Sequence, residues 1–396
     1  MRVTPHLLAG VLLVALVVGW GGFAYRMQVR TRDIRERNAA QVADIIGPAL
    51  VQAPPVFHAT GYTRDGRYTW DWRLSPTAAR ATVRMTYRRR GIMAYPTYEA
   101  NVSLKYTVAI TPVRAVPGSF KCPYPSSGEA ECYDVKLAVD GTPAQNRLPV
   151  EGFIAWRGPM EPGKARTFEV RYRARGTTSF AFGTVQDARP HDLNAEIVVE
   201  GTHGPVDFGG FSAPSEPVKR TAGGRRLTWR FTDMVANSNV GVVLPDLRSG
   251  PERLLTYALL WPLLMMGFVG TLWGAGAVAG RPLGPGSVVL LAATYAAFGA
   301  VVCYLGGVLE PELAIGAGLA ALALAVLNYL SVVAAVRFAL TYGLAAVLVF
   351  GGAFPVMATL PQHAGVAVAG GMMALMIVVM HVAARHQRRL APASGS

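Results

Sequence analysis

The segment HLLAGVLLVALVVGWGGFAY, residues 6–25, contains no Asp, Glu, Lys or Arg. As an α-helix it would be about 30 Å long, which matches the hydrocarbon core of a bilayer. Arg26 follows it directly, and no Ala-x-Ala site closes the apolar run. We therefore expect an uncleaved transmembrane signal-anchor over residues 1–25, with a cleaved signal peptide as the alternative.

The last third of the chain is equally apolar. Its five apolar stretches are residues 254–279, 286–309, 313–335, 338–360 and 364–384. Basic residues occur in alternate connections, at Arg281, at Arg337 and in the tail 386–396. Because basic connections stay on the cytoplasmic side, we expect a block of five spans over 254–385. Counted with the first helix, this predicts six spans, two cytoplasmic termini, and residues 26–253 outside the membrane.

The charges are concentrated between the first span and this block. The chain has 396 residues and is 52% hydrophobic but only 16% charged, whereas soluble domains are about a quarter charged. Residues 26–253 hold 32 of the 38 basic and 22 of the 24 acidic residues, a net charge of +10. This distribution excludes a wholly soluble enzyme, a disordered protein and a disulfide-scaffold miniprotein. It predicts a membrane protein with one aqueous domain, attracted to anionic lipid headgroups or acidic polymers.

One feature conflicts with this topology, because five arginines follow the first span on its outer side. They are Arg26, Arg30, Arg32, Arg35 and Arg37. Long domains are translocated largely regardless of flanking charge, and the five later spans agree with one another. We therefore keep residues 26–253 outside.

The aqueous domain begins with a helical pattern and then changes to period two. Residues 26–50 predict a juxtamembrane helix that continues the first span and stops at Gly47-Pro48. Residues 51–253 predict a β-rich domain, an antiparallel β-sandwich or two small sandwiches in tandem. The expected strands are Thr82–Tyr87, Ala100–Ile110, Tyr133–Val139, Arg166–Ala174, Ser179–Val185, Leu193–Val199, Arg226–Phe231 and Val240–Leu244.

Cysteine spacing gives one further expectation. Cys122 and Cys132 bracket the loop CPYPSSGEAEC, as a disulfide does in an oxidising compartment. Two free thiols, or a metal pair without its partners, are the alternatives. We predict the disulfide, and we expect Cys303, inside a span, to serve only in packing.

The search for chemistry finds no specified site. The seven histidines form no metal-ligand spacing, and neither a phosphate loop nor a nucleophile elbow is present. We therefore predict no catalytic residues, no cofactor and no metal. The spans carry no charge near their centres, where such a residue is usually functional. The candidate polar membrane residues are Asn328, expected to make a helix–helix hydrogen bond, and the edge residues Glu310 and Glu312.

Two further segments resemble a known family. They are RGIMAYPTYEANVSLKY, with Gly91, Ile92, Pro96 and Tyr98, and LTWRFTDMVANSNVGVVLPD, with Trp229, Gly241 and Pro245. Together with the layout of one helix, a β-rich domain and a block of spans, they resemble the bacterial CreD family of inner membrane proteins. The match is distant, since the early region and later spans are shorter and richer in Ala and Gly than in the family. The resemblance implies a role in cell-envelope integrity and envelope-stress tolerance, without catalytic residues.

The sequence thus predicts a non-enzymatic inner membrane protein whose β-domain binds an envelope protein or an anionic lipid. Nucleic acid is excluded as a partner of a domain that faces outward. The alternative is an envelope lipid- or glycan-handling enzyme or flippase with a site where the domain meets the membrane. A sensor would have to signal through a partner, because the cytoplasmic segments are short.

Overall fold

The computed structural model describes most of the chain. The described residues are 4–63, 66–91, 93–125, 132–144, 147–150, 152–185, 191–202, 206–234, 238–247 and 250–360, with 365–366, 369–370, 372–373, 376–377, 380 and 384. The chain divides into a β-rich unit, Arg37–Leu247, and a helical unit formed by Met1–Glu36 and Arg248–Ser396. Each unit has its own hydrophobic core.

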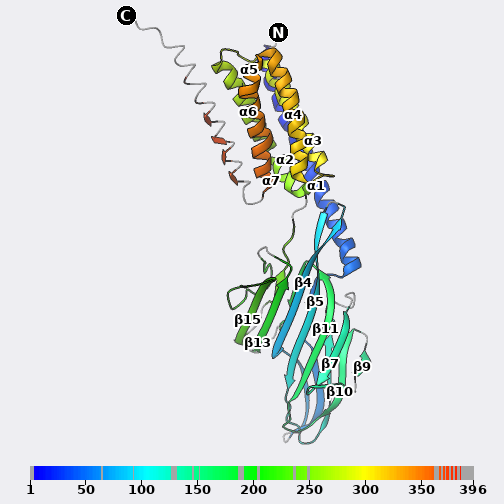
Figure 1. The fold of residues 1–396 in the computed structure, drawn as a ribbon. Coiled ribbons are helices and arrows are strands. Elements are labelled where there is room, and N and C mark those ends of the chain that lie inside the picture. The colour runs from blue at the N-terminus through cyan, green and yellow to red at the C-terminus, as the bar shows by residue number, and fades with distance from the viewer. Residues whose placement is uncertain are drawn as a thin grey trace, which may run out of the picture. The chain divides into compact units, whose positions relative to one another are not determined.

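The described strands of the β-rich unit range in length from the 2 residues of β8 to the 16 residues of β5 (Figure 1). They are β1 (Leu50–Gln52), β2 (Val56–Thr63), β3 (Gly66–Arg73), β4 (Ala78–Arg90), β5 (Met93–Val108), β6 (Val116–Pro123), β7 (Cys132–Val139), β8 (Thr142–Pro143), β9 (Arg147–Val150), β10 (Phe153–Met160), β11 (Arg166–Thr177), β12 (Ser179–Phe182), β13 (His191–Glu200), β14 (Lys219–Thr221), β15 (Gly224–Met234) and β16 (Val240–Val243). They form an eight-stranded sheet in the order β14-β15-β13-β4-β5-β11-β7-β8 and a five-stranded sheet in the order β3-β2-β6-β10-β9. A third sheet has the order β1-β12-β16.

Alternating apolar residues of the two larger sheets meet in one core. Phe120 of β6 stacks on Phe168 of β11 with ring centroids 4.4 Å apart, and both side chains are fully buried. Tyr106 and Trp156 pack around this pair. The buried cluster includes residues of all three sheets, so the unit has a single core rather than two sandwiches in tandem.

All eight expected strands have a counterpart: five lie inside longer strands, β5 ends two residues earlier than expected, and β12 and β16 are shorter than expected. The expectation of purely antiparallel pairing is wrong in two places, since β1 pairs with β12 and β4 pairs with β13 in parallel. Strands such as β6 and β10 were not expected because Gly and Pro interrupt their alternation. They tolerate Gly118 and Gly158 because neighbouring side chains fill the space where a Cβ would be.

The small third sheet receives both chain connections to the helical unit. β1 begins four residues after α1 (Pro5–Ile46) ends, and β16 ends shortly before α2 (Gly250–Val278) begins. Both strands flank β12, with Leu50 opposite Phe180 and Val243 opposite Ser179. The two connections are therefore fixed to the same end of one buried strand.

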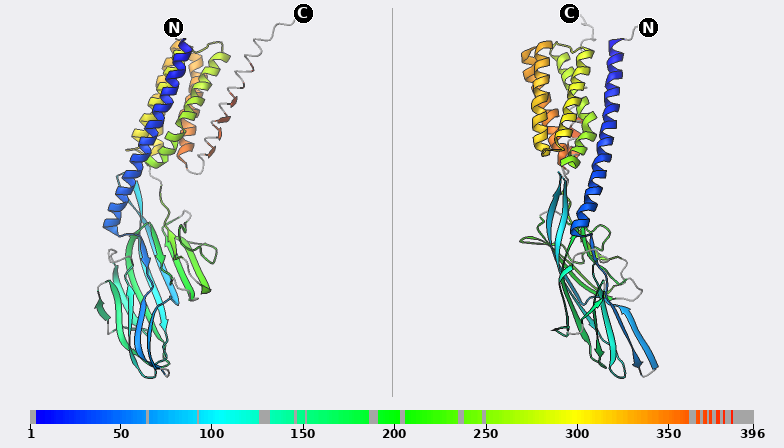
Figure 2. Two further views of the ribbon diagram at one scale, coloured as in Figure 1. Left: turned by 180° about the vertical axis from the view of Figure 1, so that it is seen from behind. Right: turned by 90° about the vertical axis from the view of Figure 1, so that its right-hand side faces the viewer.

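Residues 26–46 are helical and continue the first apolar helix. α1 is one unbroken helix from Pro5 to Ile46, as both views of Figure 2 show. Gly47 ends it with φ +120°, a conformation in which its amide donates to Ala43 O at 2.8 Å. A Cβ at Gly47 would lie 2.7 Å from Arg175 O, so only glycine fits here.

Five described helices are long and apolar enough to cross a membrane. They are α1, α2, α3 (Pro285–Leu305), α4 (Pro311–Val333) and a segment Val336–Thr359 made of α5 (Val336–Phe338), the π-helical η1 (Ala339–Gly343), α6 (Leu344–Ala346), the π-helical η2 (Val347–Ala353) and α7 (Phe354–Thr359). Four of the five expected later spans therefore correspond to a helix of this kind. The expected sixth span, 364–384, and the tail 386–396 lie largely outside the described residues.

Proline inside α2 frees a backbone carbonyl in the middle of the helix. Pro262 has no N–H, so the carbonyl of Ala258 loses its usual helical donor. The indole Nε1 of Trp20 in α1 donates to Ala258 O at 2.8 Å instead. The Trp20 ring also stacks on Trp261 at 4.1 Å, so this bond joins the N-terminal helix to the later helices.

The same arrangement recurs at the second internal proline. Phe354 N donates to Val349 O in the π-helical register, and Pro355 has no N–H to offer Phe350 O. The hydroxyl of Tyr295 in α3 donates to Phe350 O at 2.7 Å. Because hydrocarbon offers no hydrogen bonds, each carbonyl freed by proline requires such a partner.

Ion pairs join the ends of these helices. Arg35 of α1 pairs with Glu252 in the first turn of α2, and Arg253 pairs with Glu312 in the first turn of α4. Arg253 Nε also donates to Thr359 O at 3.2 Å. The basic run after the first span thus has a structural role at Arg35.

Replacing Trp20 with Phe should keep the aromatic packing but leave Ala258 O without a donor. We expect the free energy of unfolding to fall by about 1 kcal/mol. The measurement is an unfolding titration with SDS from mixed micelles. Trp273→Phe is the control, since Trp273 is 48% exposed. Equal midpoints for the two variants would contradict the assigned role of Trp20.

Candidate functional site

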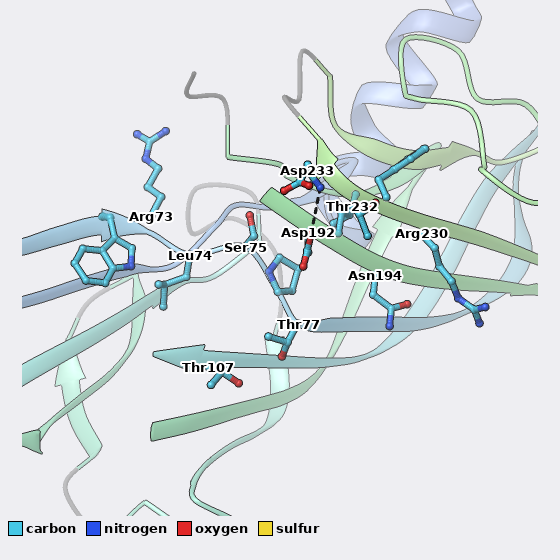
Figure 3. Close-up of a pocket in the computed structure, with 14 residues that line it drawn as sticks. Arg73, Leu74, Ser75, Thr77, Thr107, Asp192, Asn194, Arg230, Thr232 and Asp233 are labelled. Carbon is cyan, nitrogen blue, oxygen red and sulfur yellow. Dashed lines mark hydrogen bonds between the residues drawn. The ribbon is translucent and has the colours of Figure 1, made fainter. Parts of the chain in front are cut away.

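A cleft of about 870 Å³ lies in the β-rich unit, within the size range of ligand sites. Its walls are the turn between β3 and β4, the start of β13, the end of β15 and one residue of β5. The lining residues are Trp72, Arg73, Leu74, Ser75, Pro76, Thr77, Thr107, Asp192, Leu193, Asn194, Arg230, Phe231, Thr232 and Asp233. Figure 3 shows the labelled members of this set.

The turn between β3 and β4 is held rigidly. Leu74 is buried and its amide donates to Pro55 O at 2.9 Å. The amide and the hydroxyl of Thr77 both donate to Lys105 O, at 2.8 and 3.0 Å. The turn therefore continues the pairing of β4 with β5 and gives the cleft a fixed wall.

A β-bulge places two carboxylates at the opposite wall. The register of β13 against β15 shifts between His191 and Leu193, so Asp192 lies opposite an extra residue. Asp233 takes up this extra residue with φ +51°, a left-handed conformation that Asp adopts more readily than most residues. Its amide donates to Asp192 Oδ1 at 3.2 Å, drawn as a dashed line in Figure 3.

Donor groups lie beside these carboxylates. Asn194 and Arg230 are cross-strand partners on β13 and β15, and their side chains extend on the same side of the sheet (Figure 3). Arg230 pairs with Glu216 at 3.2 Å, which joins β15 to the segment before β14. Arg73 lies exposed at the end of β3. Half-buried Trp72 and Phe231 give the cleft an apolar part.

This arrangement is suited to binding through hydrogen bonds. Within a short range it offers carboxylate acceptors, guanidinium and amide donors, and the hydroxyls of Ser75, Thr77, Thr107 and Thr232. Among the described residues, no three His, Cys, Asp or Glu side chains lie close enough together to hold a metal ion. The lining gives no nucleophile hydrogen-bonded to a base.

The residues with CreD-like spacing lie apart from the cleft, and several surround the third sheet. The Tyr98 hydroxyl donates to Ser179 O at 2.7 Å and accepts from Leu50 N at 3.3 Å. Gly241 lies opposite Ala181, where a Cβ would come within 2.6 Å of the Ala181 Cβ. Pro245 O accepts the hydroxyl of Tyr87 at 2.9 Å. These residues fix the connections to the helical unit.

The remaining residues of these motifs are also structural. Gly91 has φ +59° at the turn between β4 and β5, and Ile92 lies outside the described residues. Pro96 is buried and its carbonyl accepts the amide of Thr178 at 3.4 Å. Trp229 is fully buried and its Nε1 donates to Ser212 O at 2.9 Å.

The predicted disulfide between Cys122 and Cys132 is absent, and both residues are thiols. In the sequence the two cysteines lie at the ends of one short loop. In the structure they belong to different sheets, because Cys122 is in β6 of the five-stranded sheet and Cys132 is in β7 of the eight-stranded sheet. Cys122 is fully buried, with Gln52 Nε2 at 3.6 Å from its Sγ. Burial raises the pKa of Cys122 to about 12 and that of Cys132 to about 11.

The candidate polar membrane residues do not converge. The Asn328 side chain is exposed on α4, and the expected helix–helix hydrogen bond is not formed with any described residue. Glu310 is the N-cap residue of α4, without a side-chain capping bond, and Glu312 is paired with Arg253. These positions mark helix ends and the bundle surface.

The cleft itself was not expected from the sequence. Its residues come from four distant segments, and none forms a local motif. One local feature could have indicated it. In Phe231-Thr232-Asp233-Met234 two successive polar residues interrupt the alternation of a strand, a pattern that an extra residue in a β-bulge produces.

Comparisons with known proteins give weak similarities. No family model matches the chain, and no curated protein matches it. Among solved structures, a putative nutrient binding protein from Legionella pneumophila has 11% sequence identity and a TM-score of 0.34, covering 54% of this chain and 85% of that one. An M1 zinc metallopeptidase from Deinococcus radiodurans has 11% identity and a TM-score of 0.24, covering 77% of this chain and 94% of that one. Similarities at this level carry no conclusion about fold or function.

The close approach at Gly241 predicts a large effect of a single methyl group. Gly241→Ala should separate β16 from β12 and lower the free energy of unfolding by about 1–3 kcal/mol. Gly223→Ala is the control, because nothing lies within 4 Å of a Cβ at that position. Thermal unfolding of the full chain in detergent measures both. A Gly241→Ala variant as stable as the control would show that β16 does not pair closely with β12.

The raised thiol pKa values predict slow alkylation of the folded chain. Since burial disfavours the thiolate, iodoacetamide should label Cys122 and Cys132 only slowly at pH 8, and faster as the pH rises toward 11. Unfolded without reductant, each chain should yield three reactive thiols, counted by mass spectrometry. A yield of one would mean that the disulfide forms after all.

Proposed function

We propose that this chain is a multi-pass inner membrane protein that holds its β-rich unit outside the cytoplasmic membrane to bind an envelope partner. Both termini are then cytoplasmic, and residues 26–253 are extracytoplasmic. The chain performs no chemistry of its own in this proposal. Its role in envelope integrity or envelope-stress tolerance follows from the CreD-like layout and motifs.

The cleft between β3, β4, β13 and β15 carries the proposal. Its exposed lining combines acceptors, at Asp192 and Asp233, with donors, at Arg73 and Asn194. A lipid chain would leave these groups without hydrogen-bond partners. The main chain of a protein loop carries one N–H donor and one C=O acceptor per residue, so it can pair with both kinds of group. The favoured partner is therefore a protein segment.

The alternative, a lipid- or glycan-handling enzyme or flippase, would need polar side chains that converge within the spans. Of the candidates, Glu312 is neutralised by Arg253, and Asn328 lies on the surface of α4. The described parts of the spans therefore add no support for this alternative.

Site-specific photo-crosslinking in native membranes tests the proposal. A photoreactive side chain at Thr232, inside the cleft, should capture one defined protein, identified by mass spectrometry. The same side chain at Arg157, exposed on β10 and outside the cleft, is the control.

Removing two donors should weaken this capture. In the double variant Arg73→Ala and Asn194→Ala, the crosslink yield from Thr232 should fall at least fivefold, the effect of about one hydrogen bond. A yield unchanged by the double variant, or equal capture from Arg157, would rule out the cleft as the binding site.

A further inference from the structure

The hairpin of β4 and β5 projects beyond the eight-stranded sheet. β13 pairs with β4 only as far as Arg84, and β11 pairs with β5 only as far as Thr97. The pairing of β4 with β5 continues to Arg90 and Met93. The last four residues of β4 (87–90) and the first four of β5 (93–96) thus form a two-stranded ribbon about 13 Å long.

The chain holds this ribbon firmly, although an isolated two-stranded ribbon is only marginally stable. Met93 and Tyr95 are buried against Val42 in the last turns of α1. On the other strand, the Tyr87 hydroxyl donates to Pro245 O at 2.9 Å. The ribbon therefore contacts both segments that connect the β-rich unit with the membrane spans.

Three consecutive arginines occupy the tip. Arg88, Arg89 and Arg90 are exposed, and their side chains form no ion pair with the described residues. Several other arginines of the same sheet have acidic partners, as in the pair of Arg84 with Glu200 at 3.3 Å. Asp246 lies by Tyr87, and its single negative charge leaves the three arginines with a net positive charge.

The pleat distributes these charges around the ribbon. Successive side chains of a strand point to opposite faces, so Arg88 and Arg90 share one face and Arg89 has the other. Positive charge therefore surrounds the end of the ribbon, which suits end-on contact with an extended anionic surface. A single bound ion would engage only one face.

Covalent connectivity limits how far this tip can be from a bilayer. Pro245, in contact with Tyr87, precedes the start of α2 at Gly250 by five residues, which span at most about 17 Å when fully extended. Exposed arginines that come within about 10 Å of a membrane surface attract its anionic headgroups.

We propose that Arg88, Arg89 and Arg90 bind the phosphates of anionic phospholipids at the outer surface of the membrane that the chain spans. This inference rests on the proposed membrane insertion and is independent of the cleft. Each arginine near an anionic surface raises membrane affinity about fivefold. The contact would fix the orientation of the β-rich unit toward the bilayer.

Hydrogen exchange of the full chain in lipid nanodiscs tests this inference. One nanodisc contains 30% phosphatidylglycerol in phosphatidylcholine, and the other contains phosphatidylcholine alone. We expect amide exchange in residues 87–95 to be at least fivefold slower in the anionic nanodisc, and 0.5 M NaCl should remove the difference because it screens exposed charges.

Two triple variants distinguish an effect of the tip arginines from an effect of the net charge of the chain. Arg88→Gln, Arg89→Gln and Arg90→Gln together should abolish the difference between the nanodiscs. The matched control replaces Arg67, Lys121 and Arg157 with Gln, three exposed cations of the five-stranded sheet, and should keep it. Exchange in the core strands reports whether each variant is folded.

Equal exchange in the two nanodiscs for the unmodified chain would overturn the inference, as would a difference that persists in the tip variant. Crosslinking from Thr232 is measured separately, so a lost tip contact with intact capture would reject only the lipid contact. Lost capture with an intact tip contact would reject only the cleft.

Discussion

A backbone carbonyl that proline deprives of its helical N–H needs another donor, and this constraint organises the helical unit, whose helices are apolar enough to cross a membrane. Pro262 and Pro355 each leave one carbonyl without its helical N–H. Trp20 and Tyr295 supply the missing donors from other helices. The prolines thus specify which helices pack together, and Trp20 does so across more than two hundred residues of intervening sequence. Gly299 completes the arrangement, since a Cβ there would lie 2.6 Å from Trp261 and 2.7 Å from Trp20.

The β-rich unit has a different constraint. Its strands must form one core, although the chain enters and leaves it next to helices apolar enough to cross a membrane. The third sheet solves this by pairing the first strand and the last strand with β12. Gln52 of β1 then extends into the core, where its amide accepts from Tyr172 at 2.6 Å and donates to Pro123 O at 3.0 Å. One fully satisfied buried side chain therefore ties β1 to β6 and β11, which belong to the other two sheets.

Local periodicity predicted much of this fold, and long-range pairing did not follow from it. The spans, the helix that ends at Gly47 and the eight alternating strands are visible because each pattern is contained in one segment. The parallel pairing of β4 with β13 joins residues more than a hundred positions apart, and nothing in either strand encodes the choice. The disulfide failed as a prediction because the spacing of Cys122 and Cys132 is local, whereas their sheets differ. The cleft was not predicted for the same reason. Asp192 and Asp233 are far apart in the sequence, and only the bulge between β13 and β15 brings them together.

The geometry of the third sheet also determines how the attachment responds to force. β1 runs parallel to β12 and β16 runs antiparallel to it, so the chain enters and leaves at the same end of β12. Tension directed along the strands would load their hydrogen bonds in shear. Such bonds must break together, whereas a perpendicular pull would unzip them one at a time. The attachment should therefore resist tension along the strands better than a pull perpendicular to them.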